Sequence, residues 1–191
     1  MKHLMTPFLI MMAVAVLAQD NMQTLFSPGK SQLTGAYGVA RINFSEMHGQ
    51  PATLLGGYGG AVFNKQWMFG AGAYTLLNGM KINIDDNPNT YQQLTYIGLI
   101  GEYSHQPNKA FHFTGHLLLG GASIGKQIST DGQGGYSHTI GGALAVEPGA
   151  GMELNITRWF RTSAGATYRW IINQPDISAA SFYVSLKFGK F

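Results

Sequence analysis

Two histidines are the first candidates for metal chemistry, because His112 and His116 lie four positions apart in a segment with strand character. On an extended strand this spacing places both side chains on one face, about 13 Å apart. That is too far for one ion, whose ligand bonds are about 2 Å long. The chain has no Cys, and no carboxylate stands beside either histidine. We therefore expect no metal site and no cofactor, and two lining residues that hydrogen-bond to Glu or Tyr.

Two Ser–His neighbours raise the question of hydrolytic chemistry. Ser104 and His105 follow Glu102, and Ser137 precedes His138. A Ser–His–acid triad needs its side chains within hydrogen-bonding reach, whereas adjacent residues on a strand point to opposite faces. A triad would therefore need partners from neighbouring strands. The sequence favours a protein without catalytic residues, and the enzymatic alternative stays open.

The acidic segment 81–90 has the oxygen-rich composition that Ca²⁺ prefers, since it holds Asp85, Asp86 and several Asn residues. It lacks the Gly and Glu spacing of an EF-hand loop, which favours a solvated turn. No GxxxxGK[ST], GxSxG or HExxH motif occurs in the chain. The Gly-Ala-Gly sequence at 70–72 lies in an alternating segment with no helix after it, so it does not indicate a dinucleotide site.

These residues must be positioned by strands, because alternation with a period of two dominates the chain after residue 32. In 158–172, a face of aromatic, Ala and Thr residues alternates with a face of Arg, Ser, Gly and Thr. The segments with strand character are 33–46, 52–64, 67–79, 92–105, 110–125, 138–155, 158–172 and 179–190. Proline cannot donate to a strand ladder, so Pro148 predicts a bulge or bend in the sixth segment.

Short and long connections alternate between these segments. The first connection, near 48–51, is itself short, and the later ones are, in chain order, 64–66, 80–91, 106–109, 126–137, 155–158 and 173–178. An even number of strands puts both termini on the side of the short turns. Aromatic residues gather beside the same turns and the chain end: Phe63, Trp67, Tyr103, Phe111, Trp159, Phe160 and Phe188. Because aromatic belts and short turns on one side are typical of membrane barrels, we predict an all-β, eight-stranded antiparallel up-and-down transmembrane β-barrel.

The polar face of the strands then becomes the lumen of this barrel. An eight-stranded barrel is only wide enough for side chains to fill it, and an unpaired buried ion costs several kcal/mol. We therefore expect a plugged interior in which opposite charges pair, with a small polar channel as the alternative. The predicted lumen residues are Arg41, Glu102, His112, His116, Glu147, Glu153, Arg161, Arg169 and Lys187.

The first residues are typical of an export signal. Lys2 precedes an apolar run that ends in Val16-Leu17-Ala18, which predicts a signal peptide over 1–18. The barrel would then occupy 19–191, with a lead to about residue 32. Charged residues make up only 11% of the chain, and there are 26 Gly residues. The net charge of +3 comes without any run of Lys or Arg, so we expect no nucleic-acid partner.

The leader, the Gly/aromatic strands and the chain end together resemble the small eight-stranded outer-membrane barrels of the OmpA/OmpX type. The residues that carry this resemblance are Val16-Leu17-Ala18, the segments 56–63 and 69–74, and the end 182–188. The resemblance implies location in the outer membrane of a Gram-negative bacterium and insertion by the barrel-assembly machinery. That machinery reads a terminal aromatic on the apolar face. Here Phe188 and Phe191 differ in parity, and either is a candidate.

The expected function is that of an integral, non-enzymatic outer-membrane barrel. It would act through the loops 80–91 and 126–137 in envelope integrity, adhesion or docking of an extracellular partner, with outer-membrane lipid around it. Three alternatives remain open. They are a narrow transporter or channel for small or apolar solutes, a lipid-modifying outer-membrane enzyme, and a soluble periplasmic ligand-binding barrel.

Overall fold

The computed structural model describes residues 32–77, 80–81, 90–130 and 133–191, and the side chains of 32–77, 92–125 and 141–191. The signal peptide expected over 1–18 lies outside the described residues, as do most of the lead to about 32 and the acidic residues of 81–90. Residues 33–191 form one compact unit. Within the described part of the chain, no helix is long and apolar enough to cross a membrane.

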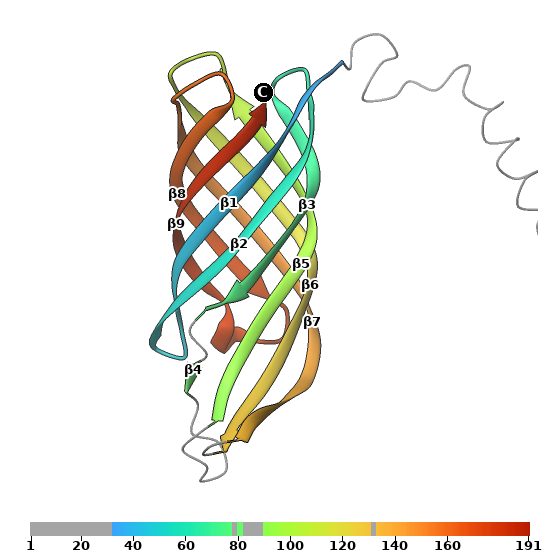
Figure 1. Ribbon diagram of the computed structural model, residues 1–191, viewed down its shortest axis with the longest axis vertical. Helices are drawn as coiled ribbons and strands as arrows, with labels where there is room; N and C mark the ends of the chain where they lie inside the picture. Colours follow the sequence, from blue (N-terminus) through green and yellow to red (C-terminus); the bar gives the residue numbers. More distant parts are fainter. Residues whose placement is uncertain (1–31, 78–79, 82–89, 131–132) are drawn as a thin grey trace, which may run out of the picture. The chain divides into compact units, whose positions relative to one another are not determined.

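Eight long strands form a closed antiparallel barrel (Figure 1). They are β1 (Leu33–Met47), β2 (Gln50–Phe63), β3 (Trp67–Leu76), β5 (Thr90–His105), β6 (Phe111–Thr130), β7 (Gln133–Asn155), β8 (Phe160–Ile171) and β9 (Ala179–Lys190). Each of these eight strands pairs with the next one in the chain, and β1 pairs with β9 to close the ring. The short strand β4 (Met80–Lys81) lies between β3 and β5 in the sequence, but β3 and β5 pair directly. The predicted eight-stranded antiparallel barrel is confirmed.

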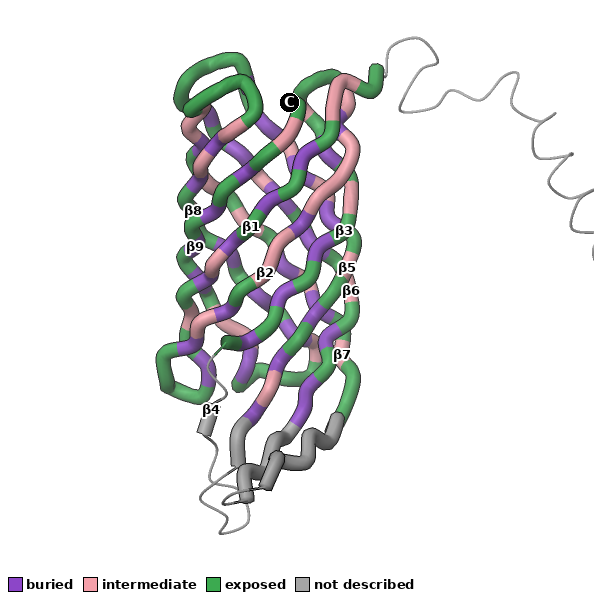
Figure 2. Tube along the Cα trace, in the orientation of Figure 1, coloured by how far each residue is buried: buried purple, intermediate pink, exposed green. Residues whose placement is uncertain are grey.

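Along the described parts of most long strands, buried residues alternate with residues that are exposed or half-buried, as Figure 2 shows. In β9 each second residue faces inward, from Ser181 to Lys187, and the residues between them are exposed. The outward positions carry large apolar side chains, including Phe182 at 74% and Leu99 at 73% exposure, whereas Arg41 and Lys187 are buried inside. Exposed apolar side chains in this number, together with buried charged residues, are not what a water-soluble domain shows.

The two ends of the barrel differ. Figure 1 shows three short turns and the C-terminus at one end, which we call the turn end; the turns are 64–66, 106–110 and 156–159. In the first of them Asn64 and Lys65 have φ values of 52° and 62°, and the Gln66 N–H donates to the Phe63 carbonyl at 3.1 Å. Two successive left-handed residues make the type I′ turn that suits strand twist. We call the opposite end the loop end.

The prediction of a long loop over 126–137 is wrong. β6 continues to Thr130 and β7 begins at Gln133, so the ladder extends through most of this segment. β7 pairs with β8 only up to Ala145, opposite Ile171. β5, β6 and β7 therefore continue beyond the closed barrel at the loop end (Figure 1). The Gly-rich, polar composition suggested a loop, but a backbone ladder needs no particular side chains once its register is set by the barrel.

Of the bulge or bend expected at Pro148, the strand register shows no bulge. Pro148 pairs in register with Leu117 of β6, and the register with β8 is the same on both sides of the proline. The effect of the missing N–H is a local gap, because the β7–β8 ladder has no pairs between Val146 and Gly149. The two register shifts between β6 and β7 lie instead between Ile124 and Gly125 and between Ile128 and Thr130.

The chain end changes direction at Gly189, whose φ is 153°. Before it, Phe188 faces outward and packs on Phe160 with ring centroids 4.9 Å apart. After it, Phe191 turns toward the lumen, where the Arg161 guanidinium lies 3.7 Å from its ring centroid. The two candidate terminal aromatics thus lie on different sides of the wall, and Phe188 is the one on the apolar outer face.

Replacing Gly189 with alanine is expected to lower the free energy of unfolding by about 1–3 kcal/mol. A β-carbon at this position would lie 2.3 Å from the Ala36 carbonyl oxygen, in a backbone conformation that favours glycine. Gly38→Ala is the matched control, since nothing lies within 4 Å of a β-carbon there. Urea unfolding of both variants in lipid vesicles measures the difference, and equal stabilities would contradict the constraint at Gly189.

Candidate functional site

All nine charged or histidine residues expected in the lumen lie inside the barrel, between fully buried and 9% exposed. They are Arg41, Glu102, His112, His116, Glu147, Glu153, Arg161, Arg169 and Lys187. Along the strands they form successive layers from the turn end to the loop end.

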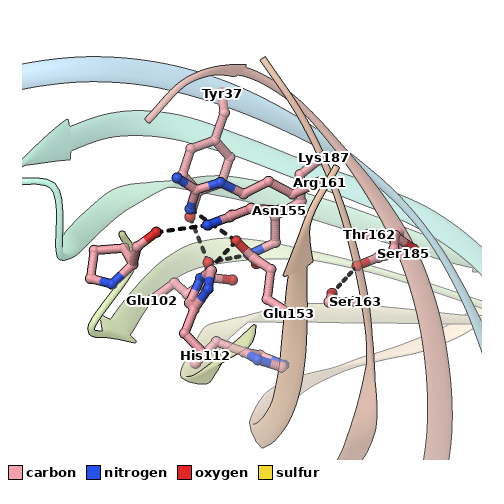
Figure 3. Close-up of polar contacts among 12 residues, drawn as sticks. Tyr37, Glu102, His112, Glu153, Asn155, Arg161, Thr162, Ser163, Ser185 and Lys187 are labelled. Atoms are coloured by element: carbon pink, nitrogen blue, oxygen red, sulfur yellow. Dashed lines mark hydrogen bonds and ion pairs between the residues drawn. The ribbon is translucent and has the colours of Figure 1, made fainter. Parts of the chain in front are cut away.

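The layer nearest the turn end is centred on Lys187, which bridges two carboxylates (Figure 3). Its ammonium group donates to Glu102, and it lies 2.6 Å from Glu153 Oε2. The hydroxyls of Tyr37, at 2.6 Å, and Tyr58 also donate to Glu102. In the ring order of the strands, β9 and β5 are each four steps apart in both directions, so the Lys187–Glu102 ion pair crosses the whole diameter of the barrel.

Glu153 also contacts the other basic residues of this layer, Arg161 and His112. Arg161 Nη1 donates to Glu153 Oε1 at 3.0 Å, and His112 Nε2 lies 3.1 Å from the same oxygen. His112 Nδ1 faces the Lys109 carbonyl at 3.2 Å, so the ring also contacts the 106–110 turn. Asn155 donates from its amide to the Pro107 carbonyl at 2.9 Å and to the Lys109 carbonyl at 2.7 Å. The network is thereby tied to the turns that close this end.

The next layer is centred on Arg41. Its guanidinium donates to His116 Nε2 at 2.9 Å and to the Tyr58 hydroxyl at 3.0 Å. It also lies 3.9 Å from the ring centroid of Tyr183, within cation–π range. Neutral rings and hydroxyls thus surround this cation, and the Tyr58 hydroxyl lies between it and Glu102.

The lumen is closed again toward the loop end. Glu147 accepts a hydrogen bond from the Tyr96 hydroxyl. Beyond it, Arg169 donates from Nε and Nη2 to the Ile177 carbonyl, both at 3.2 Å. Ile177 belongs to the 3₁₀ helix η1 (Pro175–Ile177) and is itself buried. Buried apolar side chains fill the strand ends around it: Met47, Leu54, Leu76, Leu94, Ala145 and Ile171.

Five lumen tyrosines were not part of the predicted network, although they make much of it: Tyr37, Tyr58, Tyr74, Tyr96 and Tyr183. Parity could have found them, because Tyr96 and Glu102 are an even number of residues apart on one strand, as are Tyr183 and Lys187. A buried hydroxyl needs a hydrogen-bond partner, and the Glu side chains provide one for Tyr37, Tyr58 and Tyr96.

The barrel wall separates Ser104 from its sequence neighbour His105. Glu102 and Ser104 are buried, whereas His105 is exposed. The side chains of Ser137 and His138 lie outside the described part of the chain. His112 and His116 are in different layers of the network, with Glu153 and Arg41 as their respective partners. Among the described residues, no group of three or more His, Asp or Glu side chains is arranged to hold a metal ion.

The aromatic residues expected at a membrane boundary lie at the turn end in two clusters. One contains Trp67 and Tyr103, with ring centroids 4.8 Å apart. The other contains Trp159, Phe160 and Phe188, with Phe188 within 6.2 Å of both partners. Phe63 extends the first cluster through Phe69, at 6.3 Å. Phe111 stands apart and is 63% exposed.

No protein-family model matches this sequence, and no curated protein matches it either. Solved structures do. Neisserial surface protein A superposes with a TM-score of 0.54 at 12% identity, covering 84% of this chain and 99% of that one. The N-terminal β-barrel domain of Pseudomonas aeruginosa OprF superposes with a TM-score of 0.52 at 15% identity, covering 83% of this chain and 99% of that one. Ail of Yersinia pestis superposes with a TM-score of 0.51 at 13% identity, covering 81% of this chain and 97% of that one.

The chain therefore has the fold of the small eight-stranded outer-membrane β-barrels, as the resemblance to the OmpA/OmpX type predicted. Identities of 12–15% extend the likeness to the fold alone. The role of this barrel must be argued from its own residues.

Proposed function

We propose that this protein is an integral barrel of a Gram-negative outer membrane, with a closed lumen and no enzymatic activity. The observation that carries the proposal is the apolar outer wall around an interior that holds buried ion pairs. Large apolar side chains cover the outer wall, including Ile97, Leu119 and Leu144, and the ion pairs of Lys187 and Arg161 lie inside. Acyl chains are the surroundings in which such a wall is stable, because each exposed apolar Å² costs about 25 cal/mol in water.

The closed lumen supports a role outside the barrel rather than solute passage. The Lys187–Glu102–Glu153 layer crosses the bore near the turn end, and Arg169 with Ile177 covers it near the loop end. What remains accessible is the loop end, with its extended β5–β7 strands. Rigid scaffolds commonly carry their binding residues on such projecting segments. We therefore propose adhesion, envelope integrity or partner docking through this end.

The loop end does not suit every partner known for similar barrels. Ail, the attachment invasion locus protein, was crystallised with the heparin analogue sucrose octasulfate. Among the described side chains at the loop end of the present barrel, the exposed carboxylates Glu46 and Asp176 border a common hollow with His48. These carboxylates would repel a polysulfated sugar. We therefore propose a partner whose surface does not carry the dense negative charge of a polysulfated sugar.

Residues 19–191 are expected to need detergent or lipid to stay folded, and to migrate differently on gels before and after boiling. The physical reason is the apolar wall, which has no cover in buffer. Sedimentation and unboiled electrophoresis of the refolded protein check both expectations. A monodisperse, folded protein in detergent-free buffer would disprove the membrane location and favour the soluble ligand-binding barrel.

The refolded barrel is also expected to give no conductance steps in planar bilayers, because two layers of side chains block its bore. The matched comparison is an established eight-stranded barrel reconstituted at equal protein density. Regular steps from the purified wild type would instead favour the narrow channel.

Overexpression of the protein is expected to leave the mass of lipid A unchanged. A changed mass would instead favour a lipid-modifying enzyme.

A further inference from the structure

The outer wall carries an apolar groove with a volume of about 1010 Å³. It lies across β3, β5, β6 and β7, which are neighbours on one side of the barrel (Figure 1). Large side chains form its borders, with Trp67, Phe69 and Tyr103 toward the turn end and Leu117 and Leu119 toward the loop end.

Two glycines create this groove. Gly101 pairs with Leu117, and Gly115 pairs with Tyr103, so the missing side chains lie on adjacent strands between the two borders. Neither glycine is required by packing. A β-carbon at Gly115 would meet only the Gly149 carbonyl oxygen, at 3.9 Å, and one at Gly101 would meet only the Phe69 ring, at 3.5 Å. Glycine in a strand also lowers the stability of that strand. The two glycines are therefore not explained by the packing of the barrel or by its stability.

Exposed positive charges stand at the turn end of the groove. The turn 64–66 carries Lys65, and it lies against β5, since the Ser104 N–H donates to the Gln66 carbonyl at 2.8 Å. The turn 106–110 carries Lys109 and joins β5 to β6, the strands that hold the two glycines. Both lysines are exposed. The ion pairs of the described residues all lie in the lumen, so neither ammonium group has a carboxylate partner there.

Among the described side chains, the exposed charges differ in sign between the two ends of the barrel. The exposed charged side chains described at the turn end are all basic: Lys65, Lys109, Arg158 and Lys190. The exposed carboxylates described, Glu46 and Asp176, are at the loop end. An anionic headgroup near the turn end therefore meets no opposing carboxylate. Basic residues near an anionic leaflet favour such lipids.

From the groove and the charges beside it, we infer that this wall binds one anionic phospholipid. An acyl chain lies over Gly101 and Gly115 between the aromatic and Leu borders, and the phosphate is held by Lys65 and Lys109. The inference rests on the proposed membrane location, in which the turn end faces the phospholipid leaflet. It adds a defined lipid site, with a preference for headgroup charge, to a wall that otherwise contacts lipids nonspecifically.

Native mass spectrometry of the refolded protein in detergent micelles tests this site. Phosphatidylglycerol and phosphatidylcholine with identical acyl chains are added separately at equal concentrations. We expect one phosphatidylglycerol to be retained, with an excess over phosphatidylcholine of about 30-fold for two lysines. Lys65→Gln with Lys109→Gln should remove this excess. Arg158→Gln with Lys190→Gln, which removes two exposed charges at the same end from the β7–β8 turn and from β9 rather than from the two turns beside β5, should preserve it.

The groove itself is tested by Gly115→Val, which fills the hollow and should lower retention of both lipids at least several-fold. Gly121→Val is its control, because Gly121 is also on β6, is exposed, lies outside the groove and has nothing within 4 Å of a β-carbon. Equal retention of the two lipids by the wild type would overturn the headgroup assignment. Unchanged lipid retention by Gly115→Val would contradict the groove as the binding site. A dimer in which a second copy of the chain displaces the lipid would also contradict it. A wild type that stays folded without detergent would instead overturn the proposed membrane location.

Discussion

Replacing Lys187 with methionine is expected to lower the free energy of unfolding by about 3–5 kcal/mol. Lys187 is the cation that Glu102 contacts, and it also contacts Glu153. Glu153 keeps Arg161 and His112 when Lys187 is removed, but Glu102 keeps only the hydroxyls of Tyr37 and Tyr58. A carboxylate that is 1% exposed and has lost its cation carries the full cost of desolvation.

Urea unfolding in lipid vesicles measures this loss. Lys190→Met removes an exposed lysine from the same strand and should change stability by no more than about 0.5 kcal/mol. Adding Glu102→Gln to Lys187→Met should recover a large part of the loss, because the neutral amide needs no cation. If the double variant were no more stable than Lys187→Met alone, the ion pair would not be the cause.

The second large effect is expected on the outer wall, where Ala166→Arg should destabilise the inserted barrel by about 2–4 kcal/mol. Ala166 is exposed near the middle of β8, and its strand neighbours Ala150 and Phe182 face outward with it. An arginine at this height has no charged partner on the wall and must displace acyl chains with water. The free energy of unfolding and the insertion yield in vesicles both report the cost.

Depth and charge can be separated with two further variants. Ala166→Leu adds bulk without charge and should change stability by no more than about 0.5 kcal/mol. Trp159→Arg places the same charge on a turn at the barrel end, where the cost should fall to about 0–1 kcal/mol. A wild-type insertion yield for Ala166→Arg would mean that this face of β8 does not contact lipid.

Alternation with a period of two accounts for how much of the fold could be predicted. In β8 and β9, parity alone assigns the outward Ala166 and Phe182 and the inward Arg169 and Lys187, because a strand offers only two faces. The same parity places Glu102 and Arg41 inside the barrel. The β6–β7 extension was missed because its Gly-rich sequence has no periodic apolar face, and its pairing follows from the register of the barrel below it.

The contacts within the lumen could not be predicted from parity. Parity assigns a face, but which charges meet depends on strand tilt and stagger, which the closure of the ring determines. Lys187 and Glu102 are 85 residues apart in the chain. Similarly, the groove between Gly101 and Gly115 depends on the β5–β6 register, so the glycines alone do not reveal it.

The ion pair across the bore has a consequence for assembly. β9 and β5 stand opposite each other, so neither half of the ring contains both Lys187 and Glu102. A sheet that has inserted without closing would present isolated charges to hydrocarbon. Partly assembled intermediates are therefore penalised, and the ring should close concertedly with insertion. Refolding into vesicles should accordingly follow a single kinetic phase, in which protection from protease and the heat-resistant gel form appear together.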